Sequence, residues 1–542
     1  MSHIRRCIAP LVGVLVAAPL CGGRALAETP AIIPRPVDMK VSKGEFRISG
    51  KTQVVATGQA AAEGAKLIDA LAPAMGCRLQ LVESALSKPG AIALSLDPSL
   101  KAKVGTEGYT LRVTAERIEL RAVKPFGLYY GIQTLRQLLP PAVFRNAPVT
   151  SVAWNVPCVE ITDYPRFQWR GLLIDPARHF IPKRDMMRFI DAMALHKFNR
   201  LQIHLTDHQG WRIEIRKYPL LTQVGSRMHN TLGQRRDRAK IYGGYYTQDD
   251  LRELVRYAAL RHVTIVPEIE MPGHTGAAIV AYPRLGVGTA SLSDVPIEKR
   301  WGRTGGIIAP RPETVAFLKD VLDEVAELFP SEFIHIGGDE ANIGRWAADP
   351  EMQALIKSLK LKDAHELHSW FIKQLDAHLT RRGRRLVGWD EILQGGLAPG
   401  ATVMSWRGTG GGIAAAKAGH DVVMAPTSHT YFDYRQTSDK SSDPPGFGGS
   451  VIPLAKVYTF EPIPKEINAA QAGHILGGQA QLWGELMPNE RHREFMAYPR
   501  ACAMIETLWS PKQHRDYKNF LTRLRPHLQR LQAAGIHFRR LD

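Results

Sequence analysis

Cysteine is scarce in this chain of 542 residues, which contains only five. Cys7 and Cys21 lie near the N-terminus, so Cys77, Cys158 and Cys502 are the three in the rest of the chain. No pair of these has the spacing of a cysteine metal site. The sequence therefore does not describe a disulfide-built scaffold, and we expect buried thiols, with one disulfide bridge still possible.

Long apolar runs are absent beyond the first 27 residues. That first segment has a basic start at Arg5 and an apolar stretch, residues 9–20, that is too short to span a bilayer. Ala25-Leu26-Ala27 then forms a small-x-small cleavage site. Cys21 would permit lipid attachment, but Leu20 is bulkier than the residue that usually precedes a lipidated cysteine. We predict a signal peptide over residues 1–27, no membrane span, and an exported protein, periplasmic or secreted, rather than a lipoprotein.

Nucleic-acid-binding motifs are also absent, although the chain carries a net charge of +18. The predicted signal contains three arginines and no acids, so the remainder carries +15. Its basic residues are spread out, apart from short clusters such as residues 381–385. Solvated faces and helix ends account for such a pattern, so we predict no nucleic-acid partner.

Residues 28–160 combine strand-like and helix-like patterns. Residues 109–113 and 117–121 alternate apolar with polar side chains, which predicts a hairpin of half-buried strands. Residues 60–71 and 127–139 have the pattern of helices. We predict a small α+β domain over residues 28–160.

From Arg166 onward, strand-like runs alternate with helical stretches, which predicts a parallel sheet. Eight strands over about 350 residues are typical of an α/β TIM barrel, (β/α)8. We therefore predict a barrel over residues 161–542 with a helix at its C-terminal end, residues 515–534. The predicted strands are residues 171–174, 200–205, 263–269, 333–336, 385–388, 402–405, 421–425 and 475–482, and the predicted helices include 184–196, 248–261, 313–328 and 365–381.

The fourth predicted strand ends in two glycines followed by Asp339 and Glu340. Glycine lets the backbone turn at low steric cost, so both carboxylates can reach one pocket. Two crowded carboxylates tend to hold different protonation states, which suits acid–base chemistry on a sugar or a phosphate. The alternative is a plain turn with two solvated acids.

The residues at the other predicted strand ends favour a sugar over a phosphate as the substrate. Active sites of these barrels lie at the C-terminal ends of the strands, and acids, histidines or tryptophans follow nearly every predicted strand. Tryptophans stack on pyranose rings, while carboxylates and arginines bind hydroxyl groups. Asp207, His274, His335 and Glu340 could coordinate zinc, but a helical HExxH pair is missing, so we predict neither a metal nor a cofactor. The residues after the strands are Asp175, His179, Asp207, Glu268, Glu270, His274, Asp339, Glu340, Trp389, Asp390, Glu391, Trp406, Tyr431, Asp433, Trp483 and Glu485.

His335-Ile336-Gly337-Gly338-Asp339-Glu340 resembles the signature of glycoside hydrolase family 20, the β-N-acetylhexosaminidases. Further similar stretches are Pro165 to Gly171, Asp207 to Trp211, Pro272-Gly273-His274, Gly388 to Glu391 and Trp483-Gly484-Glu485. The resemblance implies exo-acting hydrolysis of terminal, non-reducing β-linked N-acetylglucosamine or N-acetylgalactosamine residues. It also implies a retaining, substrate-assisted mechanism through an oxazoline-type intermediate.

The resemblance assigns roles by position. Glu340 would be the general acid and base, and Asp339 would bind the acetamido N–H of the sugar. Trp370, Trp389 and Trp483 would form walls around the acetamido methyl, and the Tyr431 hydroxyl would bind the acetamido oxygen. Arg170, Asp433 and Glu485 would bind the ring hydroxyls of the sugar. Asp207 and His274 would form a polar chain that tunes the pKa of Glu340. Glu270 departs from the family pattern, where Asp is common.

The substrate class is thus an oligosaccharide or glycoconjugate with a terminal N-acetylhexosamine, with chitin fragments, peptidoglycan and host glycans all open. A non-catalytic sugar-binding protein and a basic surface binder are the alternatives. The oligomeric state is not predicted.

Overall fold

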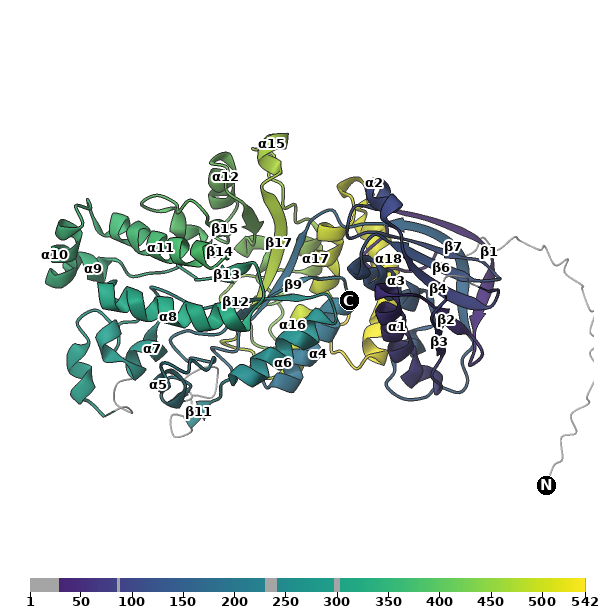
Figure 1. The fold of residues 1–542 in the computed structure, drawn as a ribbon, viewed down its shortest axis with the longest axis horizontal. Coiled ribbons are helices and arrows are strands. Elements are labelled where there is room, and N and C mark those ends of the chain that lie inside the picture. The colour runs from purple at the N-terminus through teal and green to yellow at the C-terminus, as the bar shows by residue number, and fades with distance from the viewer. Residues whose placement is uncertain (1–28, 85–87, 230–240, 297–302, 542) are drawn as a thin grey trace, which may run out of the picture.

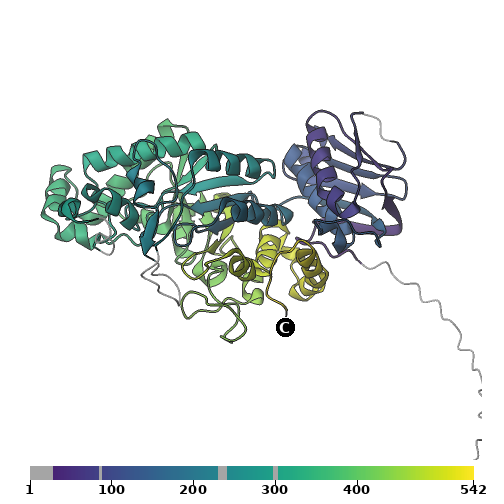
Figure 2. The same cartoon turned by 90° about the horizontal axis from the view of Figure 1, so that it is seen from below.

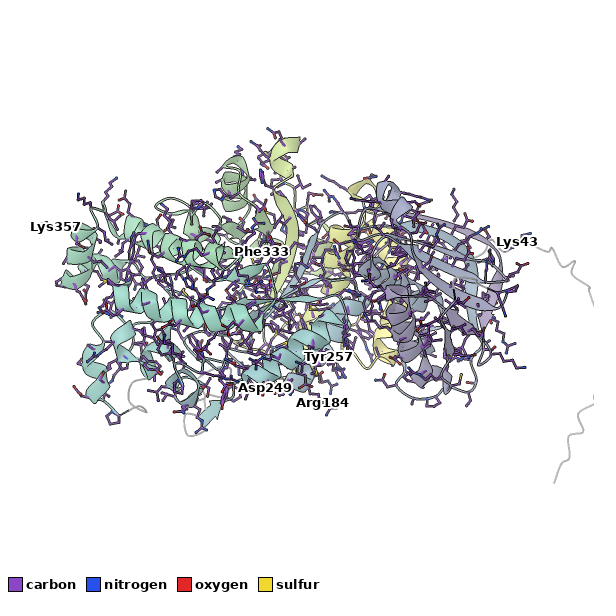
Figure 3. All side chains as sticks on the ribbon, viewed as in Figure 1. Lys43, Arg184, Asp249, Tyr257, Phe333 and Lys357 are labelled. Atoms are coloured by element: carbon purple, nitrogen blue, oxygen red, sulfur yellow. The ribbon has the colours of Figure 1, made fainter. Side chains whose placement is uncertain are left out.

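The computed structural model describes residues 29–84, 88–229, 241–296 and 303–541, which form two bodies (Figure 1). The smaller is a mixed sheet domain near the N-terminus, and the larger is a closed barrel. In Figure 3, Lys43 of the sheet domain and Lys357 of the barrel domain lie at opposite ends of the molecule. The predicted signal segment, including Cys21, lies outside the described residues. Among the described helices, none is both long and apolar enough to cross a membrane.

The sheet domain has seven strands in the order β1-β7-β5-β6-β4-β2-β3. β5 and β6 pair antiparallel as the predicted hairpin, and α1 and α3 pack against the sheet at the predicted positions. Its elements are β1 Asp38–Ile48, β2 Gln53–Val55, α1 Gln59–Met75, β3 Gln80–Val82, β4 Ala91–Leu96, α2 Lys101–Val104, β5 Tyr109–Val113, β6 Ile118–Ala122, α3 Pro125–Leu138 and β7 Trp154–Asp163.

Eight parallel strands close the barrel in the order β12-β13-β14-β15-β16-β17-β8-β9. Each lies within two residues of its prediction, because continuous apolar runs mark strands that are buried on both faces. The fold class is confirmed. The strands are β8 Trp169–Ile174, β9 Arg200–His204, β12 Thr264–Glu268, β13 Phe333–His335, β14 Arg385–Trp389, β15 Thr402–Ser405, β16 Val422–Met424 and β17 Ile475–Leu482, with a small pair outside the barrel, β10 Arg227–His229 and β11 Ile241–Gly243.

Helices surround the barrel, as the sequence predicts. α6 begins with a capping box, in which the Thr247 side chain accepts from the backbone of Asp250 and the Asp250 side chain accepts from the backbone of Thr247. The helices are α4 Lys183–Leu195, α5 Leu220–Gln223, α6 Gln248–Ala259, α7 Gly276–Ala281, α8 Pro312–Leu328, α9 Gly344–Ala348, α10 Pro350–Ser358, α11 Ala364–Arg381, α12 Gly410–Lys417, α13 Thr427–Thr430, α14 Leu454–Tyr458, α15 Ala469–Ala472, α16 Glu490–Ala497, α17 Arg500–Trp509 and α18 Tyr517–Ala533.

The barrel interior changes character from one end to the other. Near the N-terminal ends of the strands, Trp169 and Phe333 fill the interior with their rings 5.2 Å apart, edge to face. Buried polar side chains, among them Gln202, Glu268 and Gln479, occupy the next layer and are linked by hydrogen bonds. The apolar floor and the polar layer above it give the strand ends a rigid base for a functional site.

The two bodies meet through buried polar contacts. Lys197 Nζ lies 3.0 Å from Asp163 Oδ2, and Trp509 donates a 2.8 Å hydrogen bond to Asp163 Oδ1. α17 and α18, yellow in Figures 1 and 2, lie at this junction, and Arg530 of α18 donates to the backbone of Gln137 in the sheet domain. A buried charge needs a fixed partner, so these contacts define how the bodies dock.

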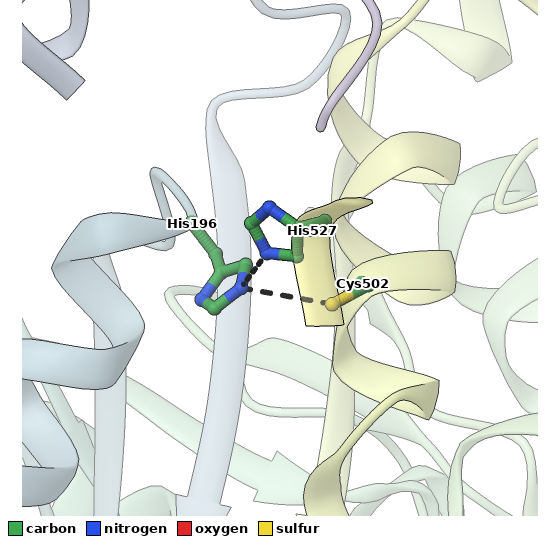
Figure 4. Close-up of side chains that lie close together, drawn as sticks. All are labelled: His196, Cys502 and His527. Carbon is green, nitrogen blue, oxygen red and sulfur yellow. Dashed lines mark hydrogen bonds between the residues drawn. The ribbon is translucent and has the colours of Figure 1, made fainter. Parts of the chain in front are cut away.

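A histidine pair and a cysteine fill the space where α4, α17 and α18 converge (Figure 4). His196 Nε2 lies 2.9 Å from His527 Nε2 and 3.6 Å from Cys502 Sγ, and all three residues are buried. Cys77, Cys158 and Cys502 are free thiols, and of these only Cys77 is partly exposed.

Candidate active site

The acid pair sits on a sharp turn after β13. Gly337 has φ 69° and Gly338 φ 96°, in the region that favours glycine, and a Cβ atom at Gly337 would come within 1.9 Å of Glu270 Oε2. Gly338 N donates a 3.0 Å hydrogen bond to Glu270 Oε1. Glu340 itself has φ 46°, a strained conformation for a residue with a side chain. The two glycines therefore make the turn that brings Asp339 and Glu340 to the barrel mouth, by which we mean the C-terminal ends of the eight strands and the loops that follow them.

The two acids differ in exposure and share a histidine. The side chain of Asp339 is 14% exposed and that of Glu340 is 59% exposed. His274 Nε2 lies 3.2 Å from Glu340 Oε2 and 3.8 Å from Asp339 Oδ2. His274 Nδ1 lies 3.3 Å from Asp207 Oδ2. The structure thus brings Asp207, His274 and Glu340 together in one chain, as the sequence predicts.

The charges in this group follow from burial and neighbours. Burial raises the pKa of Asp339, and His274 partly opposes the rise. The hydrogen bond from His274 lowers the pKa of Glu340, against partial burial. Burial lowers the pKa of His274, but the Asp207 carboxylate outweighs it and raises that pKa well above its usual value. His274 is therefore a cation between two carboxylates at neutral pH.

Aromatic rings form one wall of the mouth. Trp389 and Trp483 have ring centroids 5.8 Å apart, and Tyr431 lies 6.4 Å from Trp483. Trp406 stacks on Tyr431 at 6.1 Å, and its Nε1 donates to Glu391 Oε2. Burial raises the pKa of the Tyr431 hydroxyl well above its usual value, so it stays a neutral donor.

Trp370 is not part of this wall, which corrects the sequence prediction. It lies on α11, half-buried, against an apolar cluster that contains Trp346 and Leu367. Within the described residues it has no ring contact with Trp389. Its spacing to Trp389 suggested proximity, but a residue inside a helix does not follow a strand to the mouth. Trp406 lies in the aromatic wall instead. The sequence feature that could have identified it is its position directly after the sixth predicted strand.

Arg170 is likewise misplaced by the sequence prediction. It lies at the start of β8, fully buried, and donates to Glu107 Oε2 at 2.7 Å and to Tyr130 OH at 3.0 Å, both in the sheet domain. Strands rise about 3.3 Å per residue, so the far end of β8 lies roughly 13 Å away. Arg170 therefore helps to join the two bodies and cannot reach the mouth.

Arg178 is an arginine at the mouth that the sequence reasoning missed. Its Nη2 lies 2.6 Å from Asp207 Oδ2 and 3.8 Å from Glu485 Oε1, and its guanidinium lies over the Trp483 ring. Asp175 holds it from the other side with a 3.1 Å contact to Nη1. The sequence feature that could have identified it is its position after β8, between Asp175 and His179, both of which the sequence prediction named.

Several oxygens at the mouth are buried without a partner. Among the described residues, Asp339 Oδ1, Asp433 Oδ1 and Glu485 Oε2 accept no hydrogen bond. Each such group costs about 1–3 kcal/mol unless something donates to it. Burial raises the pKa of Asp433 well above, and that of Glu485 above, its usual range. The mouth thus offers convergent acceptors for N–H and O–H groups beside an aromatic wall.

A cation is a second candidate for part of this set. One nitrogen of His274 and one oxygen each of Asp339 and Glu340 lie within 4.8 Å of one another, as do ligand atoms of Asp207, His208 and His274. His274, however, is already engaged on both ring nitrogens by carboxylates. A metal would have to displace the proton that Asp207 stabilises there, so the donor set suits a protonated histidine better.

Comparison with known proteins gives relatives over nearly the whole chain. A β-hexosaminidase of Porphyromonas gingivalis is 41% identical over 510 residues, which cover 94% of this chain and 64% of that protein. A β-hexosaminidase of Akkermansia muciniphila is 36% identical over 430 residues, 78% of this chain and 83% of that one. A solved mutant Streptomyces plicatus β-hexosaminidase in complex with the product GlcNAc has a TM-score of 0.81 at 31% identity, covering 94% of this chain and 97% of that one.

The family patterns match both bodies. Residues 167–512 match the catalytic domain of glycosyl hydrolase family 20, and residues 29–164 match domain 2 of the same family. These ranges coincide with the barrel and the sheet domain. The chain therefore belongs to glycosyl hydrolase family 20, and with it to the glycoside hydrolases.

Proposed function

We propose that the protein is an exo-acting β-N-acetylhexosaminidase that removes terminal, non-reducing β-linked N-acetylglucosamine or N-acetylgalactosamine from oligosaccharides or glycoconjugates. The observation that carries this proposal is Asp339, whose buried Oδ1 has no partner among the described residues and lies next to the aromatic mouth. An acetamido N–H would satisfy that oxygen, and its methyl group would contact Trp389, Trp406 and Trp483. A plain hexose offers neither group.

The mechanism follows from the positions of the two acids. A proton passes through Glu340 to the glycosidic oxygen, and the bond from that oxygen to the anomeric carbon breaks. The acetamido oxygen of the same sugar attacks the anomeric carbon and forms an oxazoline-type intermediate. Asp339 accepts the acetamido N–H and stabilises the positive charge that develops there. Glu340 then takes a proton from water as the water oxygen attacks the anomeric carbon; the bond from that carbon to the acetamido oxygen breaks, the oxazoline ring opens, and the configuration is retained overall.

The remaining mouth residues bind the sugar. The unpartnered oxygens of Asp433 and Glu485 suit ring hydroxyls, and Arg178 fixes Glu485 from the side. Tyr431 keeps its proton and can donate to the acetamido oxygen, which turns that oxygen toward the anomeric carbon. These roles were predicted for Asp433, Glu485 and Tyr431, and Arg178 replaces Arg170 in the proposal.

Substrates that differ only at the 2-position test this proposal. Purified protein should release nitrophenol from the β-N-acetylglucosaminide and not from the plain β-glucoside. The kcat should fall steadily as one, two and three fluorines are placed on the acetamido methyl, because each fluorine makes the attacking oxygen less nucleophilic. Equal kcat across the fluorinated series would indicate that a carboxylate of the protein, and not the substrate, attacks the anomeric carbon.

We also propose that the protein is exported, with a mature chain of two domains, residues 28–160 and 161–542. The basic start, short apolar stretch and Ala25-Leu26-Ala27 site support this. Mass spectrometry of the mature chain should find an N-terminus at Glu28. A mature chain that begins at a lipid-modified Cys21 would replace this proposal with an anchored protein.

A further inference from the structure

A buried histidine links two carboxylates near the mouth. His204, the last residue of β9, is 1% exposed. Its Nδ1 lies 2.6 Å from Glu268 Oε2, and its Nε2 lies 3.0 Å from Asp207 Oδ2. Carboxylate oxygens accept and do not donate, so each ring nitrogen must carry a hydrogen, and only the imidazolium carries both. The contacts of His204 therefore require a buried cation between two anions.

The two carboxylates lead to opposite sides of the mouth. Glu268 Oε1 accepts a 3.0 Å hydrogen bond from Trp389 Nε1 of the aromatic wall. Asp207 holds His274, which in turn reaches Glu340 at 3.2 Å. An unbroken series of contacts thus runs from the aromatic wall to the general acid, and His204 is its centre.

Other groups also face His204. Arg178 opposes its charge, a carboxylate oxygen of Glu270 lies within 4.8 Å of a ring nitrogen, and the Trp483 ring meets it edge to face at 5.0 Å. Burial lowers the pKa of His204, but Glu268 and Asp207 outweigh both burial and Arg178 and raise it to about 10. The cation implied by the hydrogen-bond geometry is therefore stable across the working pH range.

We propose that His204 is a positioning residue that fixes Glu268 against Asp207, so that the Trp389 wall and the Asp207–His274–Glu340 chain keep one arrangement. The catalytic part of this proposal rests on the proposed function. Burial raises the pKa of Asp339; among its neighbours, His274 lowers it, Glu268 raises it, and the positive charge of His204 lowers it in turn. An ionised Asp339 is what the developing charge on the acetamido group requires.

Two substitutions separate the charge of His204 from its shape. In His204→Gln the cation is lost, so Asp339 takes up a proton at higher pH and the acid limb of kcat/KM shifts to higher pH. The kcat should fall by roughly 10- to 100-fold, the range typical of lost outer-shell partners, with KM little changed. His204→Lys restores a cation and should return the acid limb toward its wild-type position. His368→Gln removes a buried histidine on α11 away from the mouth and should leave the limb in place.

The protonation state can also be measured without activity. Protein labelled with 15N-histidine in a His274→Gln background should retain an imidazolium signal at pH 9, from His204. Loss of that signal would overturn the cation whether or not the protein hydrolyses hexosaminides. An acid limb that is the same in wild type and His204→Gln, with only a lower Tm, would reduce His204 to a structural role. This measurement also serves if His204→Gln does not fold.

Discussion

His274 Nε2 lies 3.2 Å from Glu340 Oε2. In the proposed mechanism, this contact decides which of the two side chains holds the catalytic proton. The hydrogen bond lowers the pKa of Glu340, while Asp207 raises the pKa of His274 well above its usual value, against the effect of burial. In the substrate-free protein the proton therefore resides on His274. A sugar that covers Glu340 removes water from its carboxylate and favours transfer of the proton to it.

Removing His274 should move the alkaline limb of kcat/KM to lower pH. In the wild type the proton is held by a histidine whose pKa is raised well above 6.5, so we expect activity to persist above that pH. In His274→Gln it must stay on Glu340, whose ordinary pKa is about 4.3. Initial rates between pH 4 and 9, at concentrations well below KM, measure the shift. An unchanged alkaline limb would show that His274 does not hold the proton.

Asp339→Asn should lower kcat by about 100- to 1000-fold, as for one lost transition-state contact. The amide can still contact the acetamido group, but it cannot neutralise the positive charge of the intermediate. The nitrophenyl N-acetyl-β-glucosaminide at saturation measures the effect. Asp376→Asn alters a buried acid on α11 that accepts from Gly400 and should keep kcat near wild type. Equal losses in both variants would count against a specific role for Asp339.

Arg178 and Arg170 should separate activity from stability. Arg178→Lys loses a fork that reaches Asp207 and Asp175, so kcat/KM should fall by about 10- to 100-fold, in line with charge-assisted hydrogen bonds. Arg170→Lys weakens the contact with Glu107 and should lower the urea midpoint while kcat/KM stays within about twofold. Rates and urea titrations on both variants test this. The reverse pattern would restore Arg170 as the sugar ligand.

Trp406 and Trp370 give a second matched pair. Trp406→Ala opens the wall beside Tyr431 and admits water to the acetamido group, so kcat/KM should drop by about tenfold or more. Trp370→Ala removes a half-buried ring that packs against the cluster around Trp346, away from the wall, and should leave kcat/KM for a simple aryl glycoside near wild type. A larger loss in Trp370→Ala would place that ring at the sugar after all.

Acid should destabilise the packing of α4 against α17 and α18 through the histidine pair. Burial lowers the pKa of His196 to about 4 and that of His527 well below its usual value. The unfolded chain takes up these protons near pH 6.5, so stability is complete above that pH and falls as the pH drops toward 4. The His196 contribution alone reaches about 3 kcal/mol at pH 4. Urea midpoints at pH 7.5, 5.5 and 4.5 should show a weaker pH dependence in a His196→Gln, His527→Gln double variant.

The sequence alone was sufficient to predict the barrel and most of the residues that lie at its mouth. Buried parallel strands are short apolar runs, and the polar residue that follows each run lies at the strand end. Asp339, Glu340, Asp433 and Glu485 could therefore be named from the sequence, because their place at the mouth depends on local chain order. The turn at Gly337 was expected for the same reason.

Only the tertiary structure decided which neighbours these residues have. Arg170 and Arg178 flank the same strand, but one side chain enters the junction with the sheet domain and the other enters the mouth. Trp370 lies on a helix and Trp406 follows a strand, and sequence spacing did not distinguish their surroundings. Local pattern fixes where a residue lies along its own element. Its hydrogen bonds, burial and charge depend on elements distant in sequence, which come together only when the barrel closes.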